Sequence, residues 1–174
     1  MSLRIAIGQF KELTDEKLRF AKQIGVGGIQ MNNPTLPGES RWEEQDVRAL
    51  VEKTESYGLK FEAIENVPVH FYNKVMLGLP GRDEQVENYN ATIRAVGRAG
   101  IPILGHHFMP NSVWRTDRSA PGRGDSGNTE FNMAVVERTK TIPEMMEFVP
   151  KGLGHLSAMP MHLQGEVVVD EATM

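Results

Sequence analysis

Residues 61–117 decide the fold, and they read FEAIENVPVHFYNKVMLGLPGRDEQVENYNATIRAVGRAGIPILGHHFMPNSVWRTD. The stretch contains two short apolar runs, and each run is followed directly by polar side chains. These side chains are Glu65, Asn66 and His70 after the first run, and His106 and His107 after the second. Buried parallel strands have this pattern, because their carboxyl ends open onto a site. A site made of strand ends and the loops after them is the arrangement of a βα-barrel.

The rest of the chain continues the alternation of strands and helices. We expect strands at residues 4–9, 28–31, 60–67 and 101–107. We expect a helix between each pair of successive strands, and each helix ends at a glycine: Gly25, Gly58 and Gly100. A glycine at this position supplies the left-handed residue after a helix at little steric cost.

The starts of the helices follow from capping residues. Thr14 has the position of an N-cap for the first helix, and Ser40 with Glu43 has the S-x-x-E spacing of a capping box for the second. The third helix is expected over residues 83–99. Its apolar positions predict an inward face, made up of Val86, Tyr89, Ile93 and Val96.

This alternation predicts an α/β fold with a parallel sheet and right-handed crossovers. A doubly wound sheet would give the same pattern, but the turn after the first strand lacks the G-x-G-x-x-G phosphate motif. The sequence therefore favours a TIM-barrel type. A complete eight-fold barrel needs about 250 residues, whereas the chain has 174. We expect a single domain over residues 1–174 that is the N-terminal half of a barrel with parallel strands.

The second half of the chain is less regular. Residues 111–130 are rich in Pro, Gly, Ser, Arg and Asp, which predicts a long active-site loop. Residues 131–136 fit a strand or a helix equally well. Residues 170–173 read as an acidic helix start, from which we expect the chain to be the front part of a longer protein.

Composition narrows the class of function. The formal net charge of −4 argues against a nucleic-acid-binding protein, whose binding face is usually strongly basic. No apolar run approaches the ~20 residues of a membrane span, so no membrane partner is expected. The chain has no cysteine, hence no disulfide and no thiolate metal ligand, which fits the cytoplasm.

Several separated blocks carry a family resemblance. They include ENVPVH at 65–70, LPGRD at 79–83, ENY at 87–89, TIR at 92–94, AGI at 99–101, FMP at 108–110 and WRTD at 114–117. In order and spacing they resemble the mannonate dehydratases over roughly the first two thirds of the chain. Several separated blocks are more specific than one short motif. The family commonly has Tyr-Asn where His106-His107 stand, and one more residue between Trp114 and Arg115.

The resemblance implies a hydro-lyase that dehydrates D-mannonate to 2-keto-3-deoxy-D-gluconate, a reaction of glucuronate catabolism. It also implies Mn²⁺ or a similar divalent metal, with family ligands expected beyond Met174. A base must remove the proton next to the carboxylate while the C3 hydroxyl leaves with acid help. We expect the catalytic groups to be His70, His107 and Glu65.

Substrate contacts are expected from Asn66, His106, Trp114 and Arg115. A guanidinium fork matches the carboxylate of a sugar acid, and Arg115 stands out among the arginines of its loop. His106 and His107 are adjacent on an expected strand, so they point to opposite faces and do not share a metal. We treat His155 and His162 as structural.

Each of these side chains also has a plain structural interpretation. His70 fits an ordinary loop histidine, Glu65 fits an ion pair with an arginine, and the arginines of the loop fit a solvated surface. Two other functions stay open. One is a sugar isomerase or epimerase on a similar barrel. The other is a non-catalytic half-barrel that associates, because unpaired sheet edges favour pairing with another copy; we expect a homo-oligomer.

Overall fold

The structure is a computed structural model that describes residues 3–108 and 115–138. The chain divides into two compact units, residues 1–108 and 109–174. Within the described ranges, no helix combines the length and the apolar character needed to cross a membrane.

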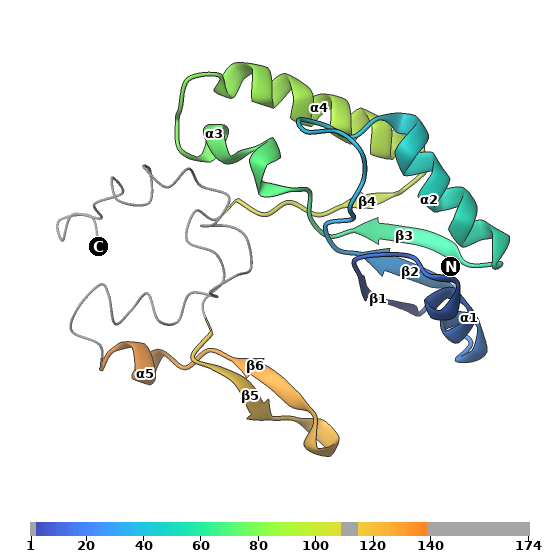
Figure 1. Ribbon diagram of the computed structural model, residues 1–174. Coiled ribbons are helices and arrows are strands. Elements are labelled where there is room, and N and C mark those ends of the chain that lie inside the picture. Colours follow the sequence, from blue (N-terminus) through green and yellow to red (C-terminus); the bar gives the residue numbers. More distant parts are fainter. Residues whose placement is uncertain (1–2, 109–114, 139–174) are drawn as a thin grey trace. The chain divides into compact units, whose positions relative to one another are not determined.

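The first unit is built on a four-stranded sheet (Figure 1). Its strands are β1 (Ala6–Phe10), β2 (Gly28–Met31), β3 (Lys60–Ile64) and β4 (Ile103–Leu104). All three neighbouring pairs are parallel, and the order is β1-β2-β3-β4. The parallel α/β sheet is confirmed. A doubly wound sheet reverses its strand order in the middle, and this sheet does not, so the barrel type is the correct alternative.

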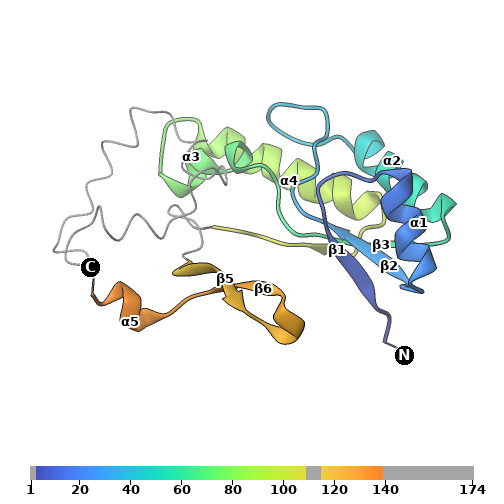
Figure 2. The same cartoon turned by 60° about the horizontal axis from the view of Figure 1, so that its bottom comes forward.

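Helices connect the strands. They are α1 (Asp15–Gln23), α2 (Glu44–Ser56), α3 (Asn73–Met76) and α4 (Arg82–Arg98), with a 3₁₀ turn η1 (Val69–Phe71) before α3. Helices α2 and α4 pack side by side on one face of the sheet (Figure 2). The expected C-terminal glycines are confirmed, since Gly25, Gly58 and Gly100 have φ values of 77°, 68° and 88°.

The helix starts match the sequence only in part. Thr14 caps α1 as expected, because the Lys17 N–H donates to Thr14 Oγ1 over 3.3 Å. The capping box at Ser40 and Glu43 was wrong: α2 begins at Glu44, and Glu43 has an extended backbone and makes no side-chain cap bond. The physical reason is tertiary. Buried Trp42 donates its N–H to Thr92 Oγ1 of α4 over 3.2 Å, which holds this segment extended.

The core lies between the sheet and its helices. Its largest buried side chains are Trp42 and Phe71, whose ring centroids are 5.8 Å apart. The expected inward face of α4 was partly wrong: Val96 is buried, but Val86 is 39% exposed and Ile93 is 46% exposed. In their place the helix buries two polar residues, Gln85 and Thr92, because both find hydrogen-bond partners in neighbouring elements.

The second unit contains a hairpin where we expected a loop. Strands β5 (Asp117–Pro121) and β6 (Gly127–Glu130) pair antiparallel across a 3₁₀ turn, η2 (Arg123–Asp125). The strands read DRSAP and GNTE, so they have no apolar alternation from which a strand could be predicted. The ambiguous stretch that follows contains a short helix, α5 (Met133–Val136), whose N-cap is Asn132. The expected helix start at 170–173 lies outside the described residues.

Candidate active site

The carboxyl ends of the four parallel strands lie side by side. Backbone hydrogen bonds join them: Asn32 N–H donates to the Phe10 carbonyl over 2.9 Å, and Glu65 N–H donates to the Met31 carbonyl over 2.8 Å. The Gly105 N–H donates to the Ile64 carbonyl over 2.7 Å. The side chains that follow each strand therefore meet along one rim, where ligands bind in barrels of this type.

Three amide side chains form a continuous row along this rim. Asn32 Nδ2 donates to Gln9 Oε1 over 3.0 Å, and Asn66 Nδ2 donates to Asn32 Oδ1 over 3.0 Å. We call Gln9, Asn32 and Asn66 the amide row. Its members come from the exits of β1, β2 and β3, so three strands contribute to one hydrogen-bonded line.

Glu65 sits next to Asn66 at the end of β3 and is half-buried. Its Oε2 accepts a hydrogen bond from Gln30 Nε2 of β2 over 3.3 Å. From the sequence, an ion pair between Glu65 and an arginine was one structural interpretation of this residue. In the described part of the chain its side-chain partner is an amide instead, while Arg4 pairs with Glu62.

His106 follows β4 and lies in an aromatic cluster. The hydroxyl of Tyr89 lies 3.0 Å from His106 Nδ1, and the Tyr72 ring centroid is 6.1 Å from that of the histidine. The ring of Phe108 stacks on His106 at 5.7 Å. Burial raises the pKa of Tyr72 to about 12 and also raises the pKa of Tyr89. Both phenols therefore stay protonated at neutral pH, and Tyr89 can donate to His106.

His70 lies in η1, on the loop that leaves β3. Its side chain is exposed, and its ring meets the Phe71 ring edge-on with centroids 4.9 Å apart. The buried Gln85 of α4 fixes this loop, because its Nε2 donates to the His70 carbonyl over 2.8 Å. The loop reaches the end of β4, since Tyr72 on it contacts His106.

The structure brings together some of the expected site residues. Glu65, Asn66 and His106 lie on or beside the rim, and His107 follows as a half-buried residue. Arg115 belongs to the second unit, where it is half-buried. Trp114, His155 and His162 lie outside the described residues.

Reasoning from the sequence missed Gln9, Gln30, Asn32, Tyr89 and Gln85. The same signal that pointed to Glu65, a polar residue at a strand exit, could have found Gln9 and Asn32. Gln30 lies inside β2, and Gln85 and Tyr89 lie on α4. Their hydrogen-bond partners become visible only in the packed structure.

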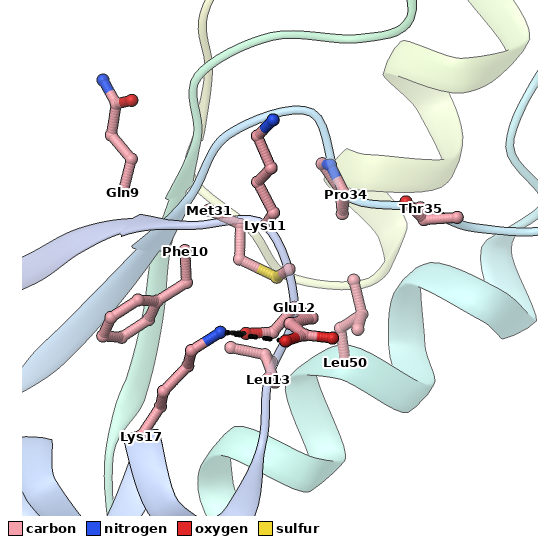
Figure 3. Close-up of a pocket in the computed structure, with 10 residues that line it drawn as sticks. All are labelled: Gln9, Phe10, Lys11, Glu12, Leu13, Lys17, Met31, Pro34, Thr35 and Leu50. Atoms are coloured by element: carbon pink, nitrogen blue, oxygen red, sulfur yellow. Dashed lines mark hydrogen bonds and ion pairs between the residues drawn. The ribbon is translucent and has the colours of Figure 1, made fainter.

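A pocket opens beside the rim, between the segments that follow β1 and β2 (Figure 3). It is lined by Gln9, Phe10, Lys11, Glu12, Leu13, Lys17, Met31, Pro34, Thr35 and Leu50. Lys17 Nζ forms an ion pair with Glu12 over 3.2 Å and lies 5.9 Å from the centre of the Phe10 ring. Gln9 thus belongs both to the pocket and to the amide row.

The described residues do not form a metal site. Within residues 3–108 and 115–138, no group of three or more His, Cys, Asp or Glu side chains is placed to hold an ion. The polar groups of the rim are instead amides, a carboxylate and a histidine, which suit hydrogen bonding to hydroxyl groups and proton transfer.

Comparison with known proteins gives consistent matches. The model of the D-mannonate dehydratase (UxuA) family matches residues 1–172. The mannonate dehydratase of Thermotoga neapolitana is 36% identical over 129 residues, which cover 74% of this chain and 35% of that protein. The mannonate dehydratase of Bacillus subtilis (strain 168) is 37% identical over 122 residues, covering 69% and 33%.

A solved structure agrees with the sequence matches. The crystal structure of mannonate dehydratase from Streptococcus suis serotype 2 superposes with a TM-score of 0.65 at 28% identity. The match covers 86% of this chain and 43% of that one. The chain spans about a third of the length of the curated relatives it matches.

Proposed function

Because the chain belongs to the mannonate dehydratase family, we propose that it forms part of a hydro-lyase that converts D-mannonate to 2-keto-3-deoxy-D-gluconate. The observation that carries the proposal is the polar rim at the carboxyl ends of β1–β4, within a chain that matches the family model almost throughout. We propose a cytoplasmic location for the same protein.

The reaction needs a base at C2 and an acid at the C3 hydroxyl. We propose that Glu65, His70 and His107 supply these proton transfers. Gln30 donates to one carboxylate oxygen of Glu65 and holds it at the rim. The other oxygen accepts no hydrogen bond within residues 3–108 and 115–138, and we propose that it meets the substrate. Histidine changes its protonation near neutral pH, so it can act in either direction.

We propose that Asn66 and His106 contact the sugar acid, and we propose a substrate-binding role for Trp114 and Arg115 as well. A guanidinium pairs with a carboxylate through two parallel hydrogen bonds, which suits Arg115 to this role. A divalent metal such as Mn²⁺ remains part of the proposal for the family. Since the described residues do not form its site, no step above depends on it.

Product analysis tests the proposed reaction. We expect that the hydro-lyase of which this chain forms part converts D-mannonate to a 2-keto-3-deoxy acid in the presence of Mn²⁺, and that Glu65→Gln lowers the rate at least about 100-fold, the usual scale of a general acid or base. Glu87→Gln on the exposed side of α4 makes the same charge change and is expected to leave the rate unchanged. A protein that forms no keto-deoxy acid from D-mannonate is not this dehydratase.

Two other functions remain as alternatives. A sugar isomerase or epimerase would use the same carboxylate and histidines, and the same assay separates it, because it would interconvert D-fructuronate or simple ketoses without forming a keto-deoxy acid. A half-barrel that associates is favoured by exposed apolar residues at the edges of the sheet, among them Ile103 of β4.

A further inference from the structure

The amide row has an internal direction. Each asparagine donates from its Nδ2 to the oxygen of the amide that precedes it in the sequence. Within the described residues, this leaves the NH₂ group of Gln9 open at one end and the Oδ1 atom of Asn66 open at the other. The row therefore presents a donor at its first member and an acceptor at its last.

The strands do not need this row in order to stay paired. The backbone bonds from Asn32 to Phe10 and from Glu65 to Met31 already hold the three exits together. A third backbone bond, from Asn33 N–H to the Asn66 carbonyl over 3.1 Å, closes the gap between the loops. Because the amide row is not needed for strand pairing, the open donor at one end and the open acceptor at the other are available to recognise a ligand.

The chemistry of the row matches a polyhydroxy acid. A hydroxyl group both donates and accepts, whereas a carboxylate only accepts. The open NH₂ of Gln9 suits an acceptor oxygen, and the open Oδ1 of Asn66 suits a hydroxyl donor. Hydrogen bonds in a line polarise one another, and fixed donors need no rearrangement when the ligand arrives.

The pocket places the donor end next to open space. Gln9 lines the pocket together with Lys11, and their side chains point in the same direction in Figure 3. Lys11 is exposed and makes no ion pair within the described residues. An acidic ligand would thus meet a positive charge beside the donor end of the row.

From these observations we propose that the amide row is a subsite that binds the polyhydroxy chain of a sugar acid, with Gln9 as its ligand-facing donor. This deepens the proposed function and rests on it only for the choice of D-mannonate as the ligand. Gln9 and Asn32 are assigned here as specificity-determining residues, with Asn32 holding the other two amides in line.

Calorimetric titration of the chain with D-mannonate and with the neutral polyol D-mannitol tests the proposal. In Gln9→Glu a carboxylate still accepts from Asn32, but the open donor is lost and a negative charge replaces it. We expect D-mannonate to bind at least about tenfold more weakly, and D-mannitol to be affected less, because its hydroxyls can donate to the new carboxylate. In Asn66→Asp the row is broken, and we expect weaker binding of both compounds.

Two further variants complete the design. Gln9→Met removes the amide without adding charge, and we expect it to weaken the binding of both ligands. Gln45→Glu, at an exposed position of α2, repeats the charge change away from the rim and is expected to leave both affinities unchanged. Thermal melting followed by circular dichroism shows that each variant is folded.

The proposal is overturned if Gln9→Glu and Gln9→Met bind D-mannonate as tightly as Gln45→Glu does, or if the unmodified chain binds neither compound. These outcomes are separate from those of the product assay. If D-mannonate is dehydrated but the Gln9 variants bind it normally, the amide row is not a subsite and the proposed reaction still stands. If the Gln9 variants bind D-mannonate more weakly but no dehydration occurs, the amide row is a subsite and the proposed reaction is wrong.

Discussion

At the scale of single residues, Gln85 shows how one polar side chain can organise a loop. It is buried on α4, and its Oε1 accepts hydrogen bonds from the Lys74 and Val75 N–H groups over 2.8 Å and 3.1 Å. Its Nε2 donates to the His70 carbonyl and to Asn73 Oδ1. The loop that carries His70 is thus held by a single amide from another element.

We expect Gln85→Ala to lower the free energy of unfolding by about 2–3 kcal/mol, because buried polar groups of the loop lose their partners. Urea unfolding followed by circular dichroism measures the change. Gln45→Ala truncates an exposed glutamine of α2 and should stay within about 0.5 kcal/mol of the parent. Equal unfolding midpoints for the two variants would show that the loop does not depend on Gln85.

At the scale of elements, the approach of β3 and β4 depends on Gly105. A Cβ atom at this position would lie 2.2 Å from the carbonyl oxygen of Glu65, which is backbone and cannot rotate away. The two strand exits can therefore come together only if this residue has no side chain. This close contact therefore sets how near Glu65 lies to the histidines that follow β4.

We expect Gly105→Ala to destabilise the protein by about 2 kcal/mol or more, since the added methyl group forces the two exits apart. Gly97→Ala is the matched control: nothing lies within 4 Å of its added Cβ, and it sits inside α4. There, alanine should stabilise the helix by about 0.5–1 kcal/mol. Thermal melts of both variants should shift in opposite directions, and parallel shifts would contradict this account.

The same elements show how far the sequence alone could go. The four strands, the glycine stops and the Thr14 cap follow from local pattern, and the structure confirms that they form. The expected ends of two strands were wrong: β3 ends at Ile64 and β4 at Leu104, before the expected residues 67 and 107, so His106 and His107 lie after the strand. The start of α2 and the buried face of α4 do not, because Trp42 and Thr92 meet only in the folded chain. At the site, Glu65 and Asn66 are visible at a strand exit, whereas the Tyr89–His106 contact depends on packing between a helix and a loop.

At the scale of the whole molecule, the sheet of the first unit keeps two edges. Within the described residues β1 and β4 each pair on one side only. Apolar side chains lie exposed there: Ile103 of β4 is 57% exposed, and Ile5 just before β1 is 73% exposed. Open edges and exposed apolar residues together favour association with another copy of the chain.

We expect the chain to sediment as a dimer or larger species at micromolar concentration. Ile103→Lys should shift it toward monomer, because a charged residue on an edge strand opposes pairing. Ile93→Lys on the outer face of α4 removes an apolar residue of similar exposure and should leave the assembly intact. A well-behaved monomer of the unmodified chain would rule out self-association through these edges.

The strand order β1-β2-β3-β4 also bears on how the protein is made. Each strand pairs with the one that precedes it in the sequence, and right-handed crossovers need no later segment to pass between earlier ones. As a nascent chain leaves the ribosome, each new strand finds its partner already present. The sheet can therefore form in the order of translation, one strand at a time, and each new strand is added at the edge of the sheet.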